Sequence, residues 1–218
     1  MHVGIVGAGM IGSTVGRLLA EAGHQVRFAS RHPEQLTTLV AEVGSNAAAA
    51  TVSDAVRFCD AILFAVPLRA WPTLAQDVGP DLAGKTVLDT SNPYENRDGV
   101  LARTVTDGGG TGVYLSALLP GVGTVRAFNT IYYKTLQSEA HRAGDKVAIP
   151  MAGDDAQTLA TAAGLVRDAG FEPVFVGPLR DAHRFDVGTS VYNKALTAAE
   201  LRRALDLPAV TAATARRA

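Results

Sequence analysis

The sequence has 218 residues, of which 47% are hydrophobic and 19% are charged, and its net charge is −1. This length and composition allow one large domain, or one domain with a small appendage, around a sizeable core. The near-neutral charge and the lack of a basic excess argue against a nucleic-acid-binding protein. No apolar run reaches the length of a membrane span, which argues against a membrane partner.

Short apolar runs alternate with segments of helical periodicity along the chain. In chain order we predict a strand at 2–6, a helix at 10–22, a strand at 25–29, a helix from Pro33 to about residue 43, a strand at 47–51, a short helix capped by Ser53 and Asp54, strands at 60–66 and 85–89, a helix at 113–119, strands at 122–128 and 146–151, a helix at 156–168, a strand at 172–176 and a helix at 196–205 with capping residues Thr197 and Glu200.

This alternation predicts an α/β protein with a doubly wound, mostly parallel sheet, the dinucleotide-binding Rossmann architecture. We expect a nucleotide-binding domain at residues 1–150 and a small α/β extension on the same sheet at 151–218. The short basic end at 212–218 is expected to be a frayed terminus.

A glycine motif, G-x-G-x-x-G, occupies residues 7–12 between the first predicted strand and the first predicted helix. In this context Gly7 permits a tight turn, Gly9 lets a pyrophosphate approach the backbone, and Gly12 lets the helix pack against the strand. The free N–H groups of the helix face the phosphates. The motif therefore predicts a dinucleotide site that includes Ala8, Met10 and Ile11.

The end of the second predicted strand indicates which dinucleotide binds. NAD sites place a carboxylate here for the ribose 2′-hydroxyl. This chain has Ser30, Arg31 and His32 instead, and no carboxylate appears before Glu34. A guanidinium suits a 2′-phosphate, which a carboxylate would repel. We therefore predict NADP(H), with a solvated Ser-Arg pair as the alternative interpretation.

Three later strand ends carry unusual sequence, namely Ala65-Val66-Pro67, Asp89-Thr90-Ser91-Asn92-Pro93 and Phe128-Asn129-Thr130. Ligands of doubly wound sheets bind at the carboxyl ends of strands, so these segments are candidates for the nicotinamide end. Asn129 and Thr130 also suit helix capping, because a helical stretch follows. The histidines lack metal-ligand spacing and there is one cysteine, Cys59, so no metal site is expected.

The motifs VGAGMIG, ASRHPE, FAVP, LDTSNP and VRAFNT, with AGDD at 152–155 and YNKALTAAELR near the end, resemble one family across residues 1–205. It is the short NADP oxidoreductases related to enzymes that pass hydride between NADP and the deazaflavin coenzyme F-420. The nicotinamide domain of certain membrane ferric reductases is also similar.

The resemblance implies direct hydride transfer between two stacked rings, with no side chain required as acid or base. It places Ser30 and Arg31 on the 2′-phosphate. It places Ala65, Val66 and Pro67 along the cofactor, and Asn92, Pro93, Asn129 and Thr130 near the nicotinamide. Two features depart from the family: Gln35 stands where a second basic residue is common, and a long polar loop is expected at 92–111.

The acceptor is left open between a deazaflavin, as the first expectation, and an imine, quinone or metal chelate. A non-catalytic NADP(H) sensor is the alternative from a different class. Trp71, Tyr132 and Tyr133 are expected to be packing residues, although Trp71 is also a candidate wall of the substrate pocket. His183 is expected on a polar helix surface, with proton donation as its alternative role. A cytoplasmic homodimer, with 179–205 as the candidate interface, completes the expectations.

Overall fold

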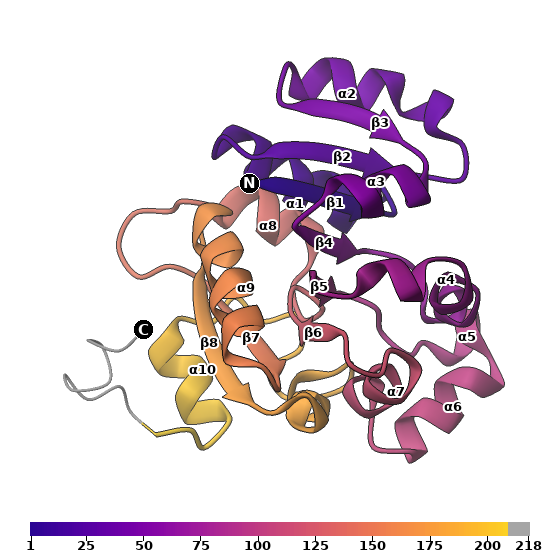
Figure 1. Ribbon diagram of the computed structural model, residues 1–218. Helices are drawn as coiled ribbons and strands as arrows, with labels where there is room; N and C mark the ends of the chain where they lie inside the picture. The colour runs from indigo at the N-terminus through magenta and orange to yellow at the C-terminus, as the bar shows by residue number, and fades with distance from the viewer. Residues whose placement is uncertain (209–218) are drawn as a thin grey trace.

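The computed structural model describes residues 1–208, in which eight strands form one sheet of order β3-β2-β1-β4-β5-β6-β7-β8. The strands are β1 (His2–Val6), β2 (Gln25–Ala29), β3 (Ala47–Ala50), β4 (Ala61–Phe64), β5 (Thr86–Asp89), β6 (Gly123–Arg126), β7 (Ala148–Gly153) and β8 (Glu172–Gly177). All neighbours pair in parallel except β6 and β7. The predicted doubly wound, mostly parallel sheet is confirmed (Figure 1). The end at 212–218 lies outside the described residues.

Ten α-helices and four short 3₁₀ helices lie between the strands or after the last of them within the described residues. The α-helices are α1 (Met10–Glu21), α2 (Thr37–Val43), α3 (Val52–Phe58), α4 (Trp71–Val78), α5 (Glu95–Asp98), α6 (Val100–Asp107), α7 (Thr111–Leu118), α8 (Tyr133–Glu139), α9 (Ala156–Asp168) and α10 (Ala198–Ala204). The 3₁₀ helices are η1 (Pro33–Leu36), η2 (Leu68–Ala70), η3 (Gly79–Leu82) and η4 (Leu179–Phe185). None of the helices described is long and apolar enough to cross a membrane.

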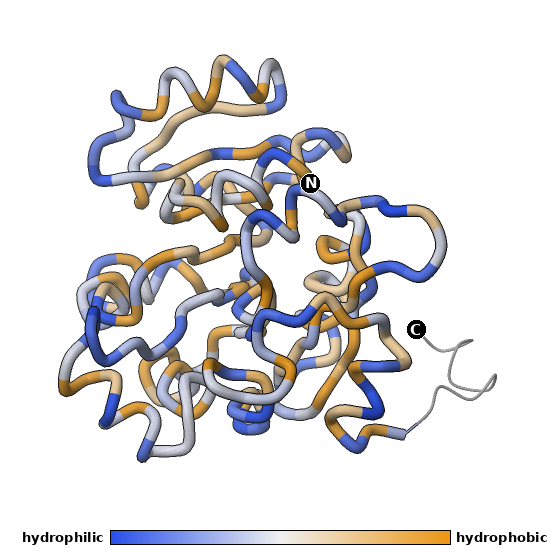
Figure 2. Tube along the Cα trace, turned by 180° about the vertical axis from the view of Figure 1, so that it is seen from behind, coloured by the Kyte–Doolittle hydropathy of each residue, from blue (hydrophilic) through white to orange (hydrophobic). Residues whose placement is uncertain are grey.

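The core lies on both faces of the sheet because successive strand residues point to opposite sides. Ile5 and Leu63 pack with α1, α8 and α9 on one face. Ile62 and Phe64 pack with α3, α4, α6 and α7 on the other. Figure 2 shows the apolar residues running along the central strands, while the helices alternate between apolar and polar positions.

The order of β1 and its neighbours places the ligand-binding edge of the sheet. The chain moves from β1 to β2 and β3 on one side, then returns to β4 on the other side of β1. The connections diverge between β1 and β4, and the carboxyl ends of both strands open on the same edge. The turn from β1 to α1 lies at this point, so the fold itself positions the glycine motif for a ligand.

Two local expectations are corrected, and a third is confirmed. The N-cap of α3 is Thr51, whose hydroxyl accepts the N–H of Asp54 at 3.2 Å, and not Ser53 or Asp54. The expected loop at 92–111 contains α5 and α6. Ala102 and Val105 of α6 are buried one turn apart, a periodicity hidden in the sequence by the polar residues around it. The expected Thr197–Glu200 cap is confirmed as a reciprocal capping box.

Close packing of α1 on the sheet gives a stability prediction. A Cβ at Gly12 would lie 2.0 Å from the carbonyl oxygen of Gly7, which is backbone and cannot move aside cheaply. Gly12→Ala should therefore lower the free energy of unfolding by about 1–3 kcal/mol. Gly164→Ala is the matched control: this glycine lies inside α9 with open space around its Cβ position, and alanine there should add about 0.5–1 kcal/mol. Urea unfolding of both variants is the measurement, and equal effects would contradict the account.

Candidate functional site

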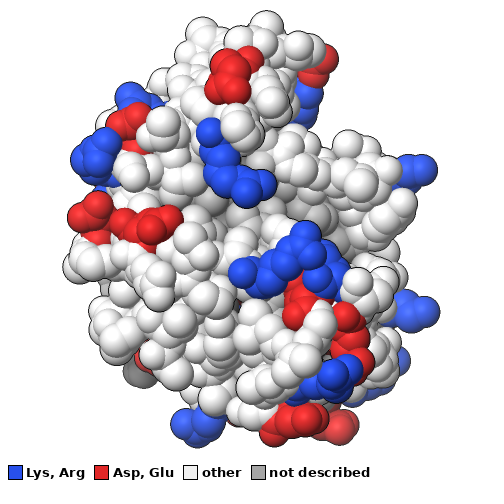
Figure 3. Space-filling model, turned by 90° about the vertical axis from the view of Figure 1, so that its right-hand side faces the viewer, with Lys and Arg blue, Asp and Glu red and all other residues white. Residues whose placement is uncertain are grey.

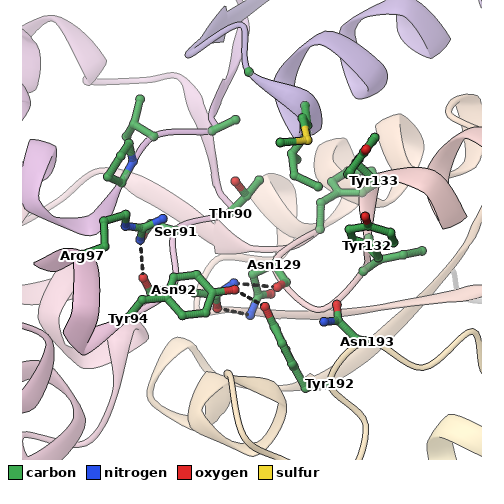
Figure 4. Close-up of a pocket in the computed structure, with 18 residues that line it drawn as sticks. Thr90, Ser91, Asn92, Tyr94, Arg97, Asn129, Tyr132, Tyr133, Tyr192 and Asn193 are labelled. Atoms are coloured by element: carbon green, nitrogen blue, oxygen red, sulfur yellow. Dashed lines mark hydrogen bonds between the residues drawn. The ribbon is translucent and has the colours of Figure 1, made fainter.

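A cleft of about 530 Å³ opens at the carboxyl ends of β1, β4, β5 and β6. The start of α1 and the segment Ala65–Pro67 form one side of it, and the segments after β5 and β6 form its floor and opposite side. Figure 4 shows these side chains converging from segments that are far apart in the sequence. Figure 3 shows the molecule hollowed, with basic side chains above and below the hollow.

The turn from β1 into α1 is shaped for an anion. Gly7 has a φ of +93°, and a Cβ there would lie 2.4 Å from the carbonyl oxygen of Ala65. α1 begins at Met10 after Gly9, with no side-chain cap and no acidic residue in its first turn. Its free N–H groups therefore present the positive end of a 12-residue helix at the cleft.

The candidate specificity residues lie at the neighbouring end of β2, outside the residues that line the cleft. The Ser30 hydroxyl accepts the backbone N–H of His32 at 3.1 Å, which fixes the turn. His32 lies 3.3 Å from the carboxylate of Glu34. Arg31, which lies between Ser30 and His32 in the sequence, is exposed. Arg31 follows the end of β2, where the carbonyl oxygen of Ala29 accepts the N–H of Gly7 at 3.1 Å, and the first carboxylate of this segment, Glu34, lies beside His32.

Beneath the cleft, Arg126 is completely buried at the end of β6 and joins three segments. Its guanidinium donates to the carboxylate of Asp89 on β5 and to the carbonyl oxygen of Ser91. It also donates to Asp186, which follows η4, at 2.5 Å. The indole N–H of Trp71 donates to Asp89 at 2.8 Å. Trp71 is thus a packing residue, as expected, and it does not line the cleft.

This cluster holds two carboxylates and one guanidinium in the interior. Burial raises the pKa of the Asp89 carboxyl, and the donors Arg126, Trp71 and Ser91 oppose this shift. Burial alone would lower the pKa of Arg126, but Asp186 and Asp89 outweigh burial and raise it. Arg126 therefore stays protonated, and its positive charge offsets the free-energy cost of burying the carboxylates of Asp89 and Asp186.

Two asparagines bring the ends of β5 and β6 together at the floor of the cleft. The amide of Asn92 donates to the backbone carbonyl of Asn129 at 2.8 Å. The Asn129 amide nitrogen lies 3.3 Å from the Asp186 carboxylate, and its oxygen, Oδ1, is buried without a partner within the described residues. Asn129 lines the cleft and therefore leaves one buried acceptor unsatisfied at its floor.

The structure excludes the capping role for Asn129 and Thr130, because the N-cap of α8 is Tyr132. The carbonyl oxygen of Thr130 instead accepts the N–H of Asn193 at 2.7 Å. Phe128, the residue before Asn129, adopts a φ of +59°, a left-handed conformation that a bulky side chain rarely takes. The turn is held by these tertiary contacts rather than by a helix.

Tyrosines dominate the rest of the cleft, since four of the five in the chain line it. Tyr132 and Tyr133 stand edge to face with ring centroids 4.7 Å apart. The expectation that these two are packing residues is wrong, because they line the cleft and Tyr132 is 47% exposed. Tyr94 and Tyr192 join through their hydroxyl groups, and the guanidinium of Arg97 lies 4.8 Å from the Tyr94 ring centroid.

The structure thus brings eight of the predicted site residues together around the cleft: Gly9, Met10, Ile11, Ala65, Val66, Pro67, Asn92 and Asn129. The others, Gly7, Ala8, Gly12, Ser30, Arg31, His32, Pro93 and Thr130, lie in adjoining turns without lining it. The residues that sequence reasoning missed include Tyr94, Arg97 and Tyr192. Tyr94 carried a usable signal, since it comes two residues after Asn92 at a strand end.

Two other expectations concern chemistry outside this cleft. His183 is exposed on η4, and its ring nitrogen Nδ1 lies 2.9 Å from the carbonyl oxygen of Arg180, which confirms its place on a helix surface. Cys59 is buried. Among residues 1–208 no group of three or more His, Cys, Asp or Glu is placed to hold a metal ion.

Comparisons with known proteins agree with this architecture. The model of a family described as "NADP oxidoreductase coenzyme F420-dependent" matches residues 2–93, which confirms the family resemblance over the glycine motif and the segments after β2, β4 and β5. No curated protein matches the sequence significantly.

Solved structures share the fold over most of the chain. A hypothetical protein from Sinorhizobium meliloti is 24% identical, with a TM-score of 0.73 over 90% of this chain and 95% of its own. A protein from Arthrobacter sp. FB24, provisionally named an F420-dependent NADP reductase, is 19% identical, with a TM-score of 0.70 over 90% and 99%. A reductive aminase from Aspergillus terreus, in complex with an NADPH form, cyclohexanone and allyl amine, is 19% identical, with a TM-score of 0.60 over 85% and 58%.

Removal of the buried cation gives a second prediction. Arg126→Met leaves Asp89 and Asp186 in the interior without their partner, so the free energy of unfolding should fall by about 3–5 kcal/mol. Without Arg126 the pKa of Asp89 rises further, and protonation then favours the folded state. The difference in free energy of unfolding between the wild type and Arg126→Met should therefore shrink as the pH falls from 8 to 5.

Urea unfolding at both pH values measures this. Arg126→Lys is the matched control, because it keeps the charge and should recover part of the loss. A difference that is the same at both pH values would contradict the electrostatic explanation.

Proposed function

We propose that this chain is an NADP(H)-dependent oxidoreductase that moves a hydride between NADP(H) and a planar redox partner. One observation carries the proposal: a single cleft joins the free N-terminus of α1 to an aromatic floor at the switch point of the sheet. A dinucleotide laid along this edge has its pyrophosphate on the helix and its nicotinamide over the floor. The match of residues 2–93 to NADP oxidoreductases supports the same assignment.

The adenosine end of the proposed cofactor lies at the end of β2. Arg31 is exposed there, and Ser30 holds the turn through the N–H of His32. A planar guanidinium matches the charge and shape of a 2′-phosphate. Glu34 is the first carboxylate of the segment, and it lies 3.3 Å from His32. We therefore assign NADP(H) rather than NAD(H) to this site.

The nicotinamide end lies between Ala65–Pro67 and the paired asparagines. Small and rigid residues after β4 leave room for a flat ring against the backbone. The unpartnered Oδ1 of Asn129 suits the amide N–H₂ of a nicotinamide carboxamide, which has two donors to satisfy. The contact would fix the ring and thereby the face from which hydride leaves.

The acceptor that we assign first is a deazaflavin. Tyr94, Tyr132 and Tyr133 provide aromatic surface for a second flat ring beside the nicotinamide. An imine, a quinone or a metal chelate are the other candidate acceptors, the last of which would take electrons rather than a hydride, and a sensor that only binds NADP(H) is the non-catalytic alternative. The cytoplasmic homodimer expected from the sequence stays a prediction.

The test is to mix the protein with NADPH and a deazaflavin and to follow the absorbance of both. Loss of NADPH with stoichiometric reduction of the deazaflavin is the expected result. Tight NADPH binding with turnover only on cyclic imines, quinones or ferric chelates would move the assignment to that acceptor. Tight binding without turnover on any of them would overturn the enzyme assignment in favour of the sensor.

The cofactor preference has its own test. Arg31→Ala should weaken NADPH binding by about 1.5–3 kcal/mol, because it removes a charge-assisted contact to the 2′-phosphate. NADH lacks this phosphate, so its binding should change little. Arg142→Ala serves as control, since Arg142 pairs with Glu139 away from the cleft. Fluorescence titration measures both cofactors, and equal losses for NADPH and NADH would refute the assignment.

A further inference from the structure

The hydroxyl groups of Tyr94 and Tyr192 meet inside the cleft although the residues lie 98 positions apart. Tyr94 belongs to the segment after β5 and Tyr192 to the segment after η4, and both line the cleft. Figure 4 shows the two rings entering from different sides, with their hydroxyls joined near the Asn92–Asn129 pair. No role for a hydroxyl pair is required by hydride transfer alone.

Each tyrosine is held in place by its own backbone contacts. The N–H of Tyr94 donates to the buried carboxylate of Asp98 at 3.2 Å. Asp98 also binds the guanidinium of Arg97 at 2.8 Å. The segment around Tyr192 is anchored by the buried Val191 and by the bond from Asn193 N–H to the Thr130 carbonyl oxygen. The backbone at both tyrosines is therefore fixed by contacts that do not depend on the hydroxyl pair.

The arrangement of protons in such a pair leaves one available. A phenol has one O–H donor and can also accept. When one hydroxyl donates to the other, the proton of the accepting hydroxyl is not used in their bond. That proton is free for a third group, and in this cleft the third group is a bound ligand.

The surroundings keep the Tyr192 hydroxyl protonated, and a cation lies beside the pair. Burial and the hydrogen bond with Tyr94 raise the pKa of Tyr192, and the charges that act on it are Arg97, which lowers the pKa, and Asp186, which raises it. Arg97 lies over the Tyr94 ring, where a cation stabilises a transient phenolate. Both tyrosines are only half-buried, so water can replace a proton that the pair gives up.

We propose that the Tyr94–Tyr192 pair protonates the acceptor atom that receives the electron pair when hydride arrives. This rests on the proposed function. The C–H bond at C4 of the dihydronicotinamide breaks and its hydride forms a new C–H bond on the acceptor carbon. The π electrons move to a conjugated nitrogen or oxygen, which takes the proton of one tyrosine hydroxyl. The phenolate recovers a proton through its partner from water, so that NADPH, acceptor and H⁺ give NADP⁺ and the reduced acceptor.

With this role for the tyrosine pair, the cleft supplies a proton as well as a place for hydride transfer. Ring stacking and a dry slot suffice for hydride movement, but an acceptor of this class must also gain a proton. A donor inside the cleft supplies it without admitting bulk water to the reacting carbon. Positioned proton donors typically contribute factors of about 10²–10⁴ to the rate.

The experiment compares Tyr192→Phe, Tyr94→Phe and the double variant in single-turnover oxidation of NADPH by a deazaflavin and by a cyclic imine. With whichever of these two acceptors the wild type reduces, we expect the rate to fall about 100-fold or more in Tyr192→Phe. The affinity of this variant for NADPH should stay within about twofold of wild type. The wild-type rate should decline with pH only above the ordinary tyrosine pKa of about 10, and show a solvent deuterium effect that the variants lose. Tyr114→Phe, which alters the one tyrosine outside the cleft, is the control.

The outcomes separate the two proposals. If the wild type turns over and the phenylalanine variants keep its rate and pH profile, the pair is structural and the proton-donor assignment is overturned, while the proposed function stands. If the wild type binds NADPH but reduces neither these two acceptors nor a quinone or a ferric chelate, both proposals fail together. Circular dichroism and NADPH titration of each variant show whether a slow variant is folded and loaded.

Discussion

The guanidinium of Arg126 holds the carboxyl edge of the sheet together. It bonds Asp89 of β5, the carbonyl of Ser91 and Asp186 after η4 from a position with no exposure to solvent. Around it, the segments that carry Asn92, Asn129 and Tyr192 converge on one cleft. A buried ion cluster contributes little net stability compared with apolar packing, but it penalises any arrangement that separates its members. Its value here is that it fixes where three loops of the site lie.

The elements set by local rules follow from the sequence. β1, β2 and α9 begin and end where predicted, because glycine turns, strand periodicity and an Asp155 N-cap are signals within a few residues. The glycine motif was also placed correctly, since Gly7 requires a positive φ whatever surrounds it.

The parts of the site that could not be predicted depend on contacts between distant positions. The bond between Arg126 and Asp89 spans 37 residues, and that between Tyr94 and Tyr192 spans 98. No local sequence pattern indicates which distant residue each of these side chains contacts. For the same reason, the sequence predicts packing roles for Tyr132 and Tyr133, which line the cleft in the structure. The two ends of the candidate site therefore differ in kind: a compact motif predicts the dinucleotide end, while the proposed acceptor end is lined by residues that only the fold brings together.

The most direct test is a crystal structure of the protein with NADP⁺. We predict the 2′-phosphate on Ser30 and Arg31, the pyrophosphate at the start of α1, and the nicotinamide in the tyrosine-lined cleft with its carboxamide on Asn129. A nucleotide bound in the opposite direction, with adenine among the tyrosines, or a nicotinamide directed away from this cleft, would contradict this prediction.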